Sequence, residues 1–215
     1  MLLFVFVIYQ AIPSHWGMSK RNDHLIFNEI GYWFTFNMIF NALWLCIFQQ
    51  YNLPAFFVSA IDIIALLVTS LMIMMKAQRN STNFFETIGV YVAFSMYSGW
   101  VATASILNVT FCLKGIGLSE KNLGINESNY ACFILLVALV IFVIASLRER
   151  NVVFGSVWLW AVYAIKKRQV GFENIQITCD LILAIHSLFL FGLASDILYK
   201  KCVMSVVKEE AENLV

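Results

Sequence analysis

The sequence predicts an all-α, polytopic membrane protein, a transmembrane helix bundle with six to seven membrane segments. Of its 215 residues, 61% are hydrophobic and 13% are charged, whereas a soluble domain has about 25% charged residues. Several apolar runs reach the length of about 20 residues that spans a bilayer. The runs are continuous and do not alternate as barrel strands do, so helices are expected. A net charge of +1 excludes nucleic-acid binding as the main purpose.

Charged clusters separate the apolar runs and set the element boundaries. Pro54 marks a tight turn, and the loop 114–129 is the longest connection. The run 152–165 has only about 14 residues, roughly 21 Å of helix, so it is expected to be short, tilted or buried in the bundle. In chain order we expect a stub at 1–13 and helices near 27–49, 55–76, 85–113, 130–147, 152–165 and 174–199.

Polar residues inside apolar runs are the first candidates for a site, because a charge in lipid is costly. Asp62 lies inside the run 55–76 and is predicted to be structural, bonded to a backbone group or to an Asn of the next helix. Asp180 and Asp196 lie near the ends of the last helix, where water can reach them. His186 is expected to bond a neighbouring helix.

The sequence contains none of the motifs of a soluble enzyme's active site. The histidines are scattered and the five cysteines form no C-x-x-C pair, so neither a metal nor a cofactor is predicted. Cys112 and Cys132 flank one loop and could form a disulfide, although free thiols are favoured. Asn126, in Asn126-Glu127-Ser128, is the one plausible glycosylation site, because Lys and Arg counts place its loop on the non-cytoplasmic side.

One polar and aromatic motif stands out in the run 85–113. Tyr97, Trp100, Ala104 and Leu107 are spaced 3, 4 and 3 residues apart, which puts them on one stripe of a helix. Asn108 follows directly. Trp and Tyr offer flat faces with a hydrogen-bonding group each, and a small Ala permits close approach. Such a stripe suits either helix packing or a pocket for a flat apolar ligand.

This motif resembles the last-helix signature Y-x-x-W-x-x-x-A-x-x-L-N of the TspO/MBR family of tryptophan-rich sensory and translocator proteins. Phe40-Asn41-Ala42-Leu43-Trp44 is similar to the family's L-N-x-x-W segment. The resemblance extends along nearly the whole chain and is closest to a divergent, longer branch. It implies a bundle that binds porphyrins or sterol-like molecules. It also implies that Trp44, Tyr97, Trp100, Ala104 and Leu107 touch or line the pocket, while Asn41 and Asn108 brace it.

The resemblance also divides the chain. We expect a TspO-like helical core at 1–113, additional transmembrane helices at 114–199 and a polar C-terminal tail at 200–215. The family's P-x-G-W segment would precede Leu2, so we expect the N-terminal helices of the core to be missing. Val109 stands where the family's sterol motif has a Tyr, which argues against a sterol as the ligand.

Several functions fit these observations. The leading hypothesis is a multi-pass membrane protein that senses or transports a hydrophobic ligand, such as a porphyrin, without covalent chemistry. The alternatives are a non-catalytic structural or accessory subunit of a membrane complex and a membrane protein with no small-molecule site. A membrane enzyme would require Asp62 and His186 to face one water-accessible cavity. The expected partners are the lipid bilayer and the ligand, and no nucleic acid is expected. The sequence leaves open whether the protein forms a homo-oligomer.

Overall fold

A computed structural model describes residues 2–11, 22–50, 52–118 and 120–212. This part of the chain is all-α and contains no strand. It divides into two compact units, Met1–Ile134 and Leu135–Val215, which are described separately below.

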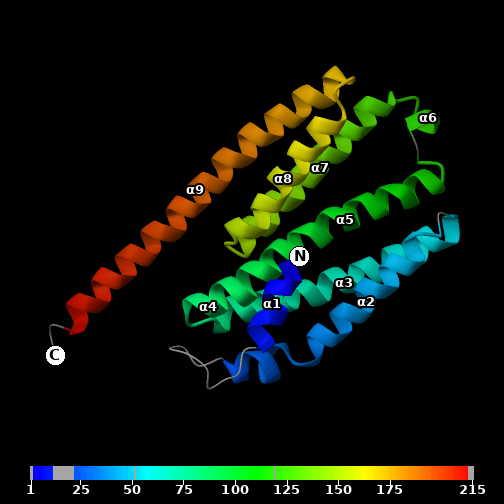
Figure 1. Ribbon diagram of the computed structural model, residues 1–215. Helices are drawn as coiled ribbons and strands as arrows, with labels where there is room; N and C mark the ends of the chain where they lie inside the picture. The colour runs from blue at the N-terminus through cyan, green and yellow to red at the C-terminus, as the bar shows by residue number, and fades with distance from the viewer. Residues whose placement is uncertain (1, 12–21, 51, 119, 213–215) are drawn as a thin grey trace. The chain divides into compact units, whose positions relative to one another are not determined.

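The first unit is built around α3 (Leu53–Asn80), which packs along α2 (Tyr32–Phe48) and α5 (Ala93–Gly115) (Figure 1). Asn52 caps α3 by accepting a hydrogen bond from the Ala55 N–H at 2.9 Å. Pro54 therefore lies in the first turn of α3 and not in a separate turn before it. The other elements are α1 (Leu2–Ala11), η1 (His24–Ile30), α4 (Phe84–Glu86), η2 (Thr87–Val92), α6 (Glu120–Leu123) and the start of α7 (Glu127–Arg148).

The single helix expected at 27–49 is divided at Gly31. The π-helical segment η1 and the helix α2 meet there at an angle of 66°. Gly31 has a φ of +44°, and a Cβ on it would lie 3.0 Å from the Phe27 carbonyl oxygen. Only glycine adopts this backbone conformation without strain. The apolar pattern continues through the break, which is why the sequence predicted one uninterrupted helix.

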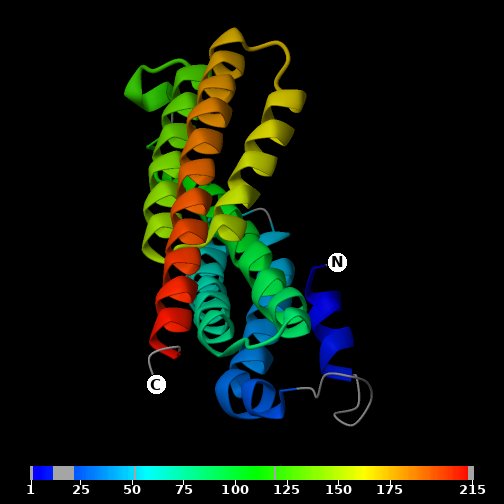
Figure 2. The same cartoon turned by 90° about the vertical axis from the view of Figure 1, so that its left-hand side faces the viewer.

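The second unit comprises α7 from residue 135, α8 (Val152–Arg168) and α9 (Glu173–Glu212). Phe142 of α7 stacks on Phe154 and Trp158 of α8, with ring centroids 5.1 and 5.2 Å apart. α8 and α9 run side by side (Figure 2). The last helix was expected to end near residue 199, but α9 continues to Glu212 and includes most of the predicted tail.

The described helices confirm a multi-pass membrane protein, with fewer candidate spans than the sequence predicted. Four helical stretches are long and apolar enough to cross a membrane, and the bent pair of η1 and α2 brings the number to five. Six to seven were expected. The difference arises from α1, with 10 residues, and α8, with 17, which are shorter than the four candidate spans. The candidate spans are Leu53–Asn80, Phe84–Gly115, Glu127–Arg148 and Glu173–Met204.

Candidate functional site

Asn108 joins three helices of the first unit through its side-chain amide. The amide oxygen accepts hydrogen bonds from the Ser59 hydroxyl at 3.0 Å and from the Trp44 indole N–H at 3.1 Å. The amide nitrogen donates to the Phe56 carbonyl at 3.2 Å. Asn108 is only 1% exposed. These bonds fix the rotation of α5 against its neighbours, because Trp44 belongs to α2 and both Phe56 and Ser59 belong to α3.

An aromatic cluster surrounds this network. Trp44 stacks on Phe48 with centroids 5.3 Å apart, and Phe56 stacks on Phe111 at 5.5 Å. Phe48 lies 5.9 Å from both Phe56 and Phe111. The sequence analysis named Trp44 and missed the three phenylalanines and Ser59, because phenylalanine is common in every apolar run of this chain. Their positions near the ends of neighbouring runs were the available signal.

The structure separates the predicted α5 stripe into a buried end and an exposed face. The Tyr97 side chain is 8% exposed, and its ring meets Phe94, which packs against Phe6 of α1. Trp100 and Leu107 are 47% and 51% exposed, with the half-buried Ala104 between them. Three of the predicted ligand-binding residues therefore form an accessible surface. Trp44 lies in the Asn108 network, and Tyr97 lies beside α1.

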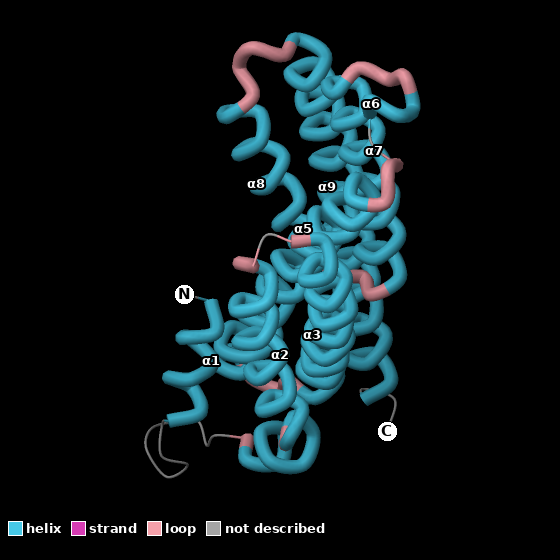
Figure 3. The backbone as a smooth tube through the Cα atoms, turned by 90° about the vertical axis from the view of Figure 1, so that its right-hand side faces the viewer, coloured by secondary structure: helices cyan, strands magenta, loops and turns pink. Residues whose placement is uncertain are grey.

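A second line of polar groups lies between α2 and α3, two helices that run side by side (Figure 3). The fully buried Asn37 donates to the Leu66 carbonyl at 3.2 Å and to the Thr69 hydroxyl at 2.8 Å. The half-buried Asn41 follows Asn37 by one turn on α2. Asp62 precedes Leu66 by one turn on α3, so the antiparallel register brings it to the level of Asn41. No hydrogen bond joins Asn41 to Asp62.

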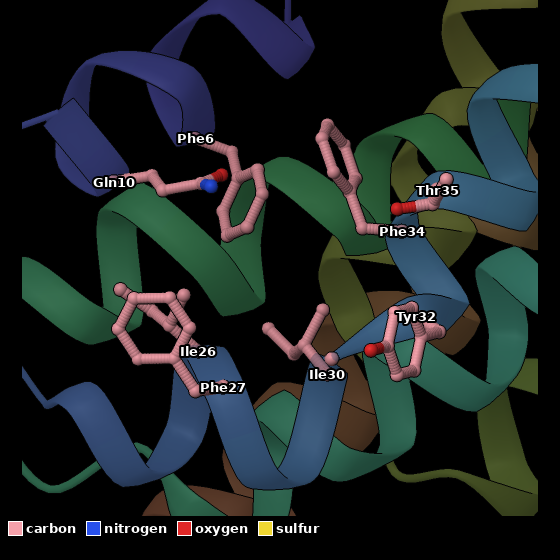
Figure 4. A pocket seen from close by; sticks show the side chains of 9 residues that line it. Phe6, Gln10, Ile26, Phe27, Ile30, Tyr32, Phe34 and Thr35 are labelled. Carbon is pink, nitrogen blue, oxygen red and sulfur yellow. The ribbon is translucent and has the colours of Figure 1, made fainter.

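Two cavities adjoin the bend at Gly31, away from the predicted stripe. One has a volume of about 310 Å³ and the other about 370 Å³, near the lower end of the range of roughly 300–1,000 Å³ for small-molecule sites. None of the five predicted ligand-binding residues lines either cavity. Figure 4 shows side chains around the first cavity: Phe6 and Gln10 from α1; Ile26, Phe27 and Ile30 from η1; Tyr32, Phe34 and Thr35 from α2.

In the second unit, His186 bonds a neighbouring helix as the sequence predicted. Its Nε2 lies 3.0 Å from the Gly155 carbonyl oxygen of α8, and the side chain has no exposed surface. A carbonyl oxygen only accepts, so Nε2 donates the hydrogen. His186 is therefore buried in the contact between α8 and α9. Asp180 and Asp196 are exposed or half-buried and pair with Lys166 and Arg150.

The remaining predicted sites are simple to place. Among the described residues, no group of three or more His, Cys, Asp or Glu side chains could hold a metal ion. Cys112 and Cys132 are free thiols, so the disulfide between them is not formed. Asn126 is exposed, and its side-chain oxygen accepts hydrogen bonds from the Ser128 backbone and hydroxyl, both at 3.1 Å. Its glycosylation stays a prediction.

Together, the helices and the intramembrane polar network define an α-helical, multi-pass membrane protein with an accessible aromatic face. Comparison with protein families identifies the family. Residues 1–193 match the TSPO-like protein family, and the chain belongs to it. The match continues beyond the core motif into α9, so the later helices are part of the family pattern. Comparisons with curated proteins and with solved structures gave no match.

Proposed function

We propose that this TSPO-like protein binds a flat hydrophobic ligand, such as a porphyrin, within the membrane and senses or transports it without catalysis. The observation that carries the proposal is the outer face of α5, where the half-exposed Trp100 and Leu107 lie on either side of Ala104. The Trp ring and Leu side chain offer apolar area, and the small Ala leaves space between them for a planar molecule.

The Asn108 network supports this proposal because it orients the face. Asn108 follows Leu107 directly, so its side chain points about 100° away around the helix. Its bonds to α2 and α3 fix the inner side of α5, and this in turn keeps Leu107 on the outer side. A preorganised apolar surface loses less entropy on binding a ligand than a mobile one. Trp44 has a supporting role in this proposal, since its indole N–H is bonded to Asn108.

The test is a titration of the purified protein with protoporphyrin, followed by quenching of tryptophan fluorescence. The Trp100→Phe, Ala104→Leu double variant removes the indole and fills the space beside it. We expect saturable quenching with a dissociation constant in the micromolar range, which is a binding free energy of about −8 kcal/mol. The double variant should lose this quenching. Quenching that is absent, or equal in the variant, would contradict a site on this face.

Two matched variants locate the effect. Trp160→Phe removes a different exposed tryptophan, which lies on α8 and is 60% exposed. This variant should keep the saturable quenching. Thr35→Phe narrows the cavity at the Gly31 bend, which Thr35 lines, and it should leave the affinity unchanged. If Thr35→Phe abolished binding while the α5 variant kept it, the ligand would occupy the bend cavity instead.

The alternative function is a structural or accessory subunit, in which the exposed α5 face packs against another protein chain or a second copy. This alternative predicts no saturable quenching and the stable copurification of a partner from gently solubilised membranes. The α5 double variant would then lose the partner. The same substitutions thus separate a ligand site from a subunit interface.

A further inference from the structure

Asp62 has no opposite charge within its surroundings. The spans that surround it are free of charged residues in α2 from 32 to 48 and in α5 from 93 to 113. In α3, Asp62 is the one charged residue between Leu53 and Met75. A carboxylate in this half-buried position would therefore have no cation beside it to offset its charge.

The depth of Asp62 along α3 adds to this isolation. It lies nine residues from Leu53 and fourteen from Lys76, which corresponds to about 14 and 21 Å of helix. The apolar part of a bilayer is about 30 Å thick. Asp62 is thus well inside the apolar region from either end, where an aspartate costs about 2.5–3.5 kcal/mol on insertion scales.

No group on the described helices around α3 donates a hydrogen bond to the Asp62 carboxyl group. Its Oδ2 atom is buried and has no hydrogen-bond partner among the described residues. The titratable groups on the elements around α3 are Cys46 of α2, Tyr97 and Cys112 of α5 and, at the ends of the spans, His24, Glu29, Tyr32, Glu86, Tyr91 and Lys114. No hydrogen bond or ion pair joins any of them to Asp62.

The nearby cations have other partners. Lys76 of α3 pairs with Glu29 of η1 at 3.0 Å. Lys114 of α5 lies 3.8 Å from a Glu127 oxygen. These pairs are at the ends of the spans, so they leave Asp62 uncompensated in the middle.

We propose that Asp62 is a proton-binding site within the membrane, where its carboxyl group is held protonated and neutral and donates its O–H into the seam between α2 and α3. A neutral acid removes the cost of a buried charge and gains a donor. The amide oxygen of Asn41, at the same level on α2, offers an acceptor. The site's ligand is the proton, independent of any ligand on the α5 face.

Infrared spectroscopy of the protein in lipid nanodiscs tests the protonation state directly. A protonated carboxyl has a C=O stretch that a carboxylate lacks. We expect this band at neutral pH and its complete loss in Asp62→Asn, with Asp180→Asn as the matched control that keeps it, since Asp180 is exposed and paired with Lys166. A spectrum without a band that depends on Asp62 at neutral pH would overturn the proposal.

Dicyclohexylcarbodiimide provides a second, chemical readout. This lipid-soluble reagent adds to a protonated carboxyl group. The acid proton moves to one carbodiimide nitrogen, and a carboxyl oxygen bonds to the central carbodiimide carbon. The acyl group then migrates from that oxygen to nitrogen, which yields a stable N-acylurea. We expect a single adduct on the peptide that contains Asp62 and none in Asp62→Asn. A water-soluble carbodiimide should modify exposed acids instead. Labelling that occurs only with the water-soluble reagent would show an ionised, hydrated Asp62 and contradict the proposal.

The folding stability of Asp62 variants distinguishes a neutral carboxylic acid from a carboxylate whose negative charge the fold requires. Asn resembles the neutral acid in shape and keeps a donor and an acceptor, so Asp62→Asn should fold as stably as the parent protein. Asp62→Leu should also fold, since no ion pair is lost. A large loss of folded protein in both variants would mean that a negative charge is required, and would overturn the assignment.

Discussion

At the residue scale, Gly155 marks the closest packing in the second unit. A Cβ on Gly155 would lie 2.6 Å from Leu190 Cδ2 and 2.6 Å from Ser146 Oγ, so two helices would have to adjust at once. We expect Gly155→Ala to destabilise the protein by about 1–3 kcal/mol, measured by unfolding in mixed micelles. Gly192 of α9 has no atom within 4 Å of the corresponding position. Gly192→Ala should therefore be neutral or stabilising, and equal losses in the two variants would contradict this packing argument.

Asn108 is the second residue at which one side chain determines local structure. Asn108→Ala removes three hydrogen bonds and leaves the N–H of the half-buried Trp44 without its acceptor. We expect a loss of about 1–3 kcal/mol in unfolding free energy. A red-shifted or less uniform fluorescence of Trp44 should accompany it. The exposed Asn122, with one bond to the Gly117 carbonyl at 2.9 Å, is the control, and its replacement by Ala should cost less than about 0.5 kcal/mol.

At the scale of elements, the bend between η1 and α2 depends on one backbone conformation. Gly31→Ala places a side chain at φ +44° and 3.0 Å from the Phe27 carbonyl oxygen. With ψ at −128° this backbone conformation is sparsely populated and costs a non-glycine residue about 1–3 kcal/mol, so we expect lower stability and a change in the adjoining cavities. Gly171 has open space around it and no positive φ. If Gly171→Ala lowered the melting temperature as much as Gly31→Ala did, the bend would not be the cause.

The elements also show how far sequence patterns predict this protein. Helices were predictable because each apolar run ends at charged residues. α3, α7, α8 and the stretch Phe84–Gly115, which comprises α4, η2 and α5, begin and end within a few residues of the expected positions. The break at Gly31 was not, since it interrupts no hydrophobic pattern. Asn108 was expected to brace the ligand pocket, which stays a prediction; the structure shows its hydrogen bonds to α2 and α3. Its partners Ser59 and Trp44 depend on which turns of α2, α3 and α5 meet, and one sequence does not contain that information.

At the scale of the whole molecule, the number of membrane crossings depends on α8. Two ion pairs tie α8 and the turn before it to α9: Arg150 of the turn with Asp196, and Lys166 of α8 with Asp180. Sixteen residues of α9 separate Asp180 from Asp196, so the apolar layer between the pairs is about 24 Å thick. This is thinner than a typical core of about 30 Å, and modest mismatch is accommodated by local thinning of the bilayer.

The two pairs thus favour a complete crossing by α8, despite its 17 residues. In a background without native cysteines, Arg148→Cys and Val170→Cys should react with a membrane-impermeant maleimide from opposite sides of sealed vesicles. Native Cys202 lies beyond Asp196 on α9 and is exposed, so when restored alone it should react from the same side as position 148. Reaction of positions 148 and 170 from one side would make α8 a re-entrant or surface helix. That result would reverse the orientation of α9 and remove one crossing from the bundle.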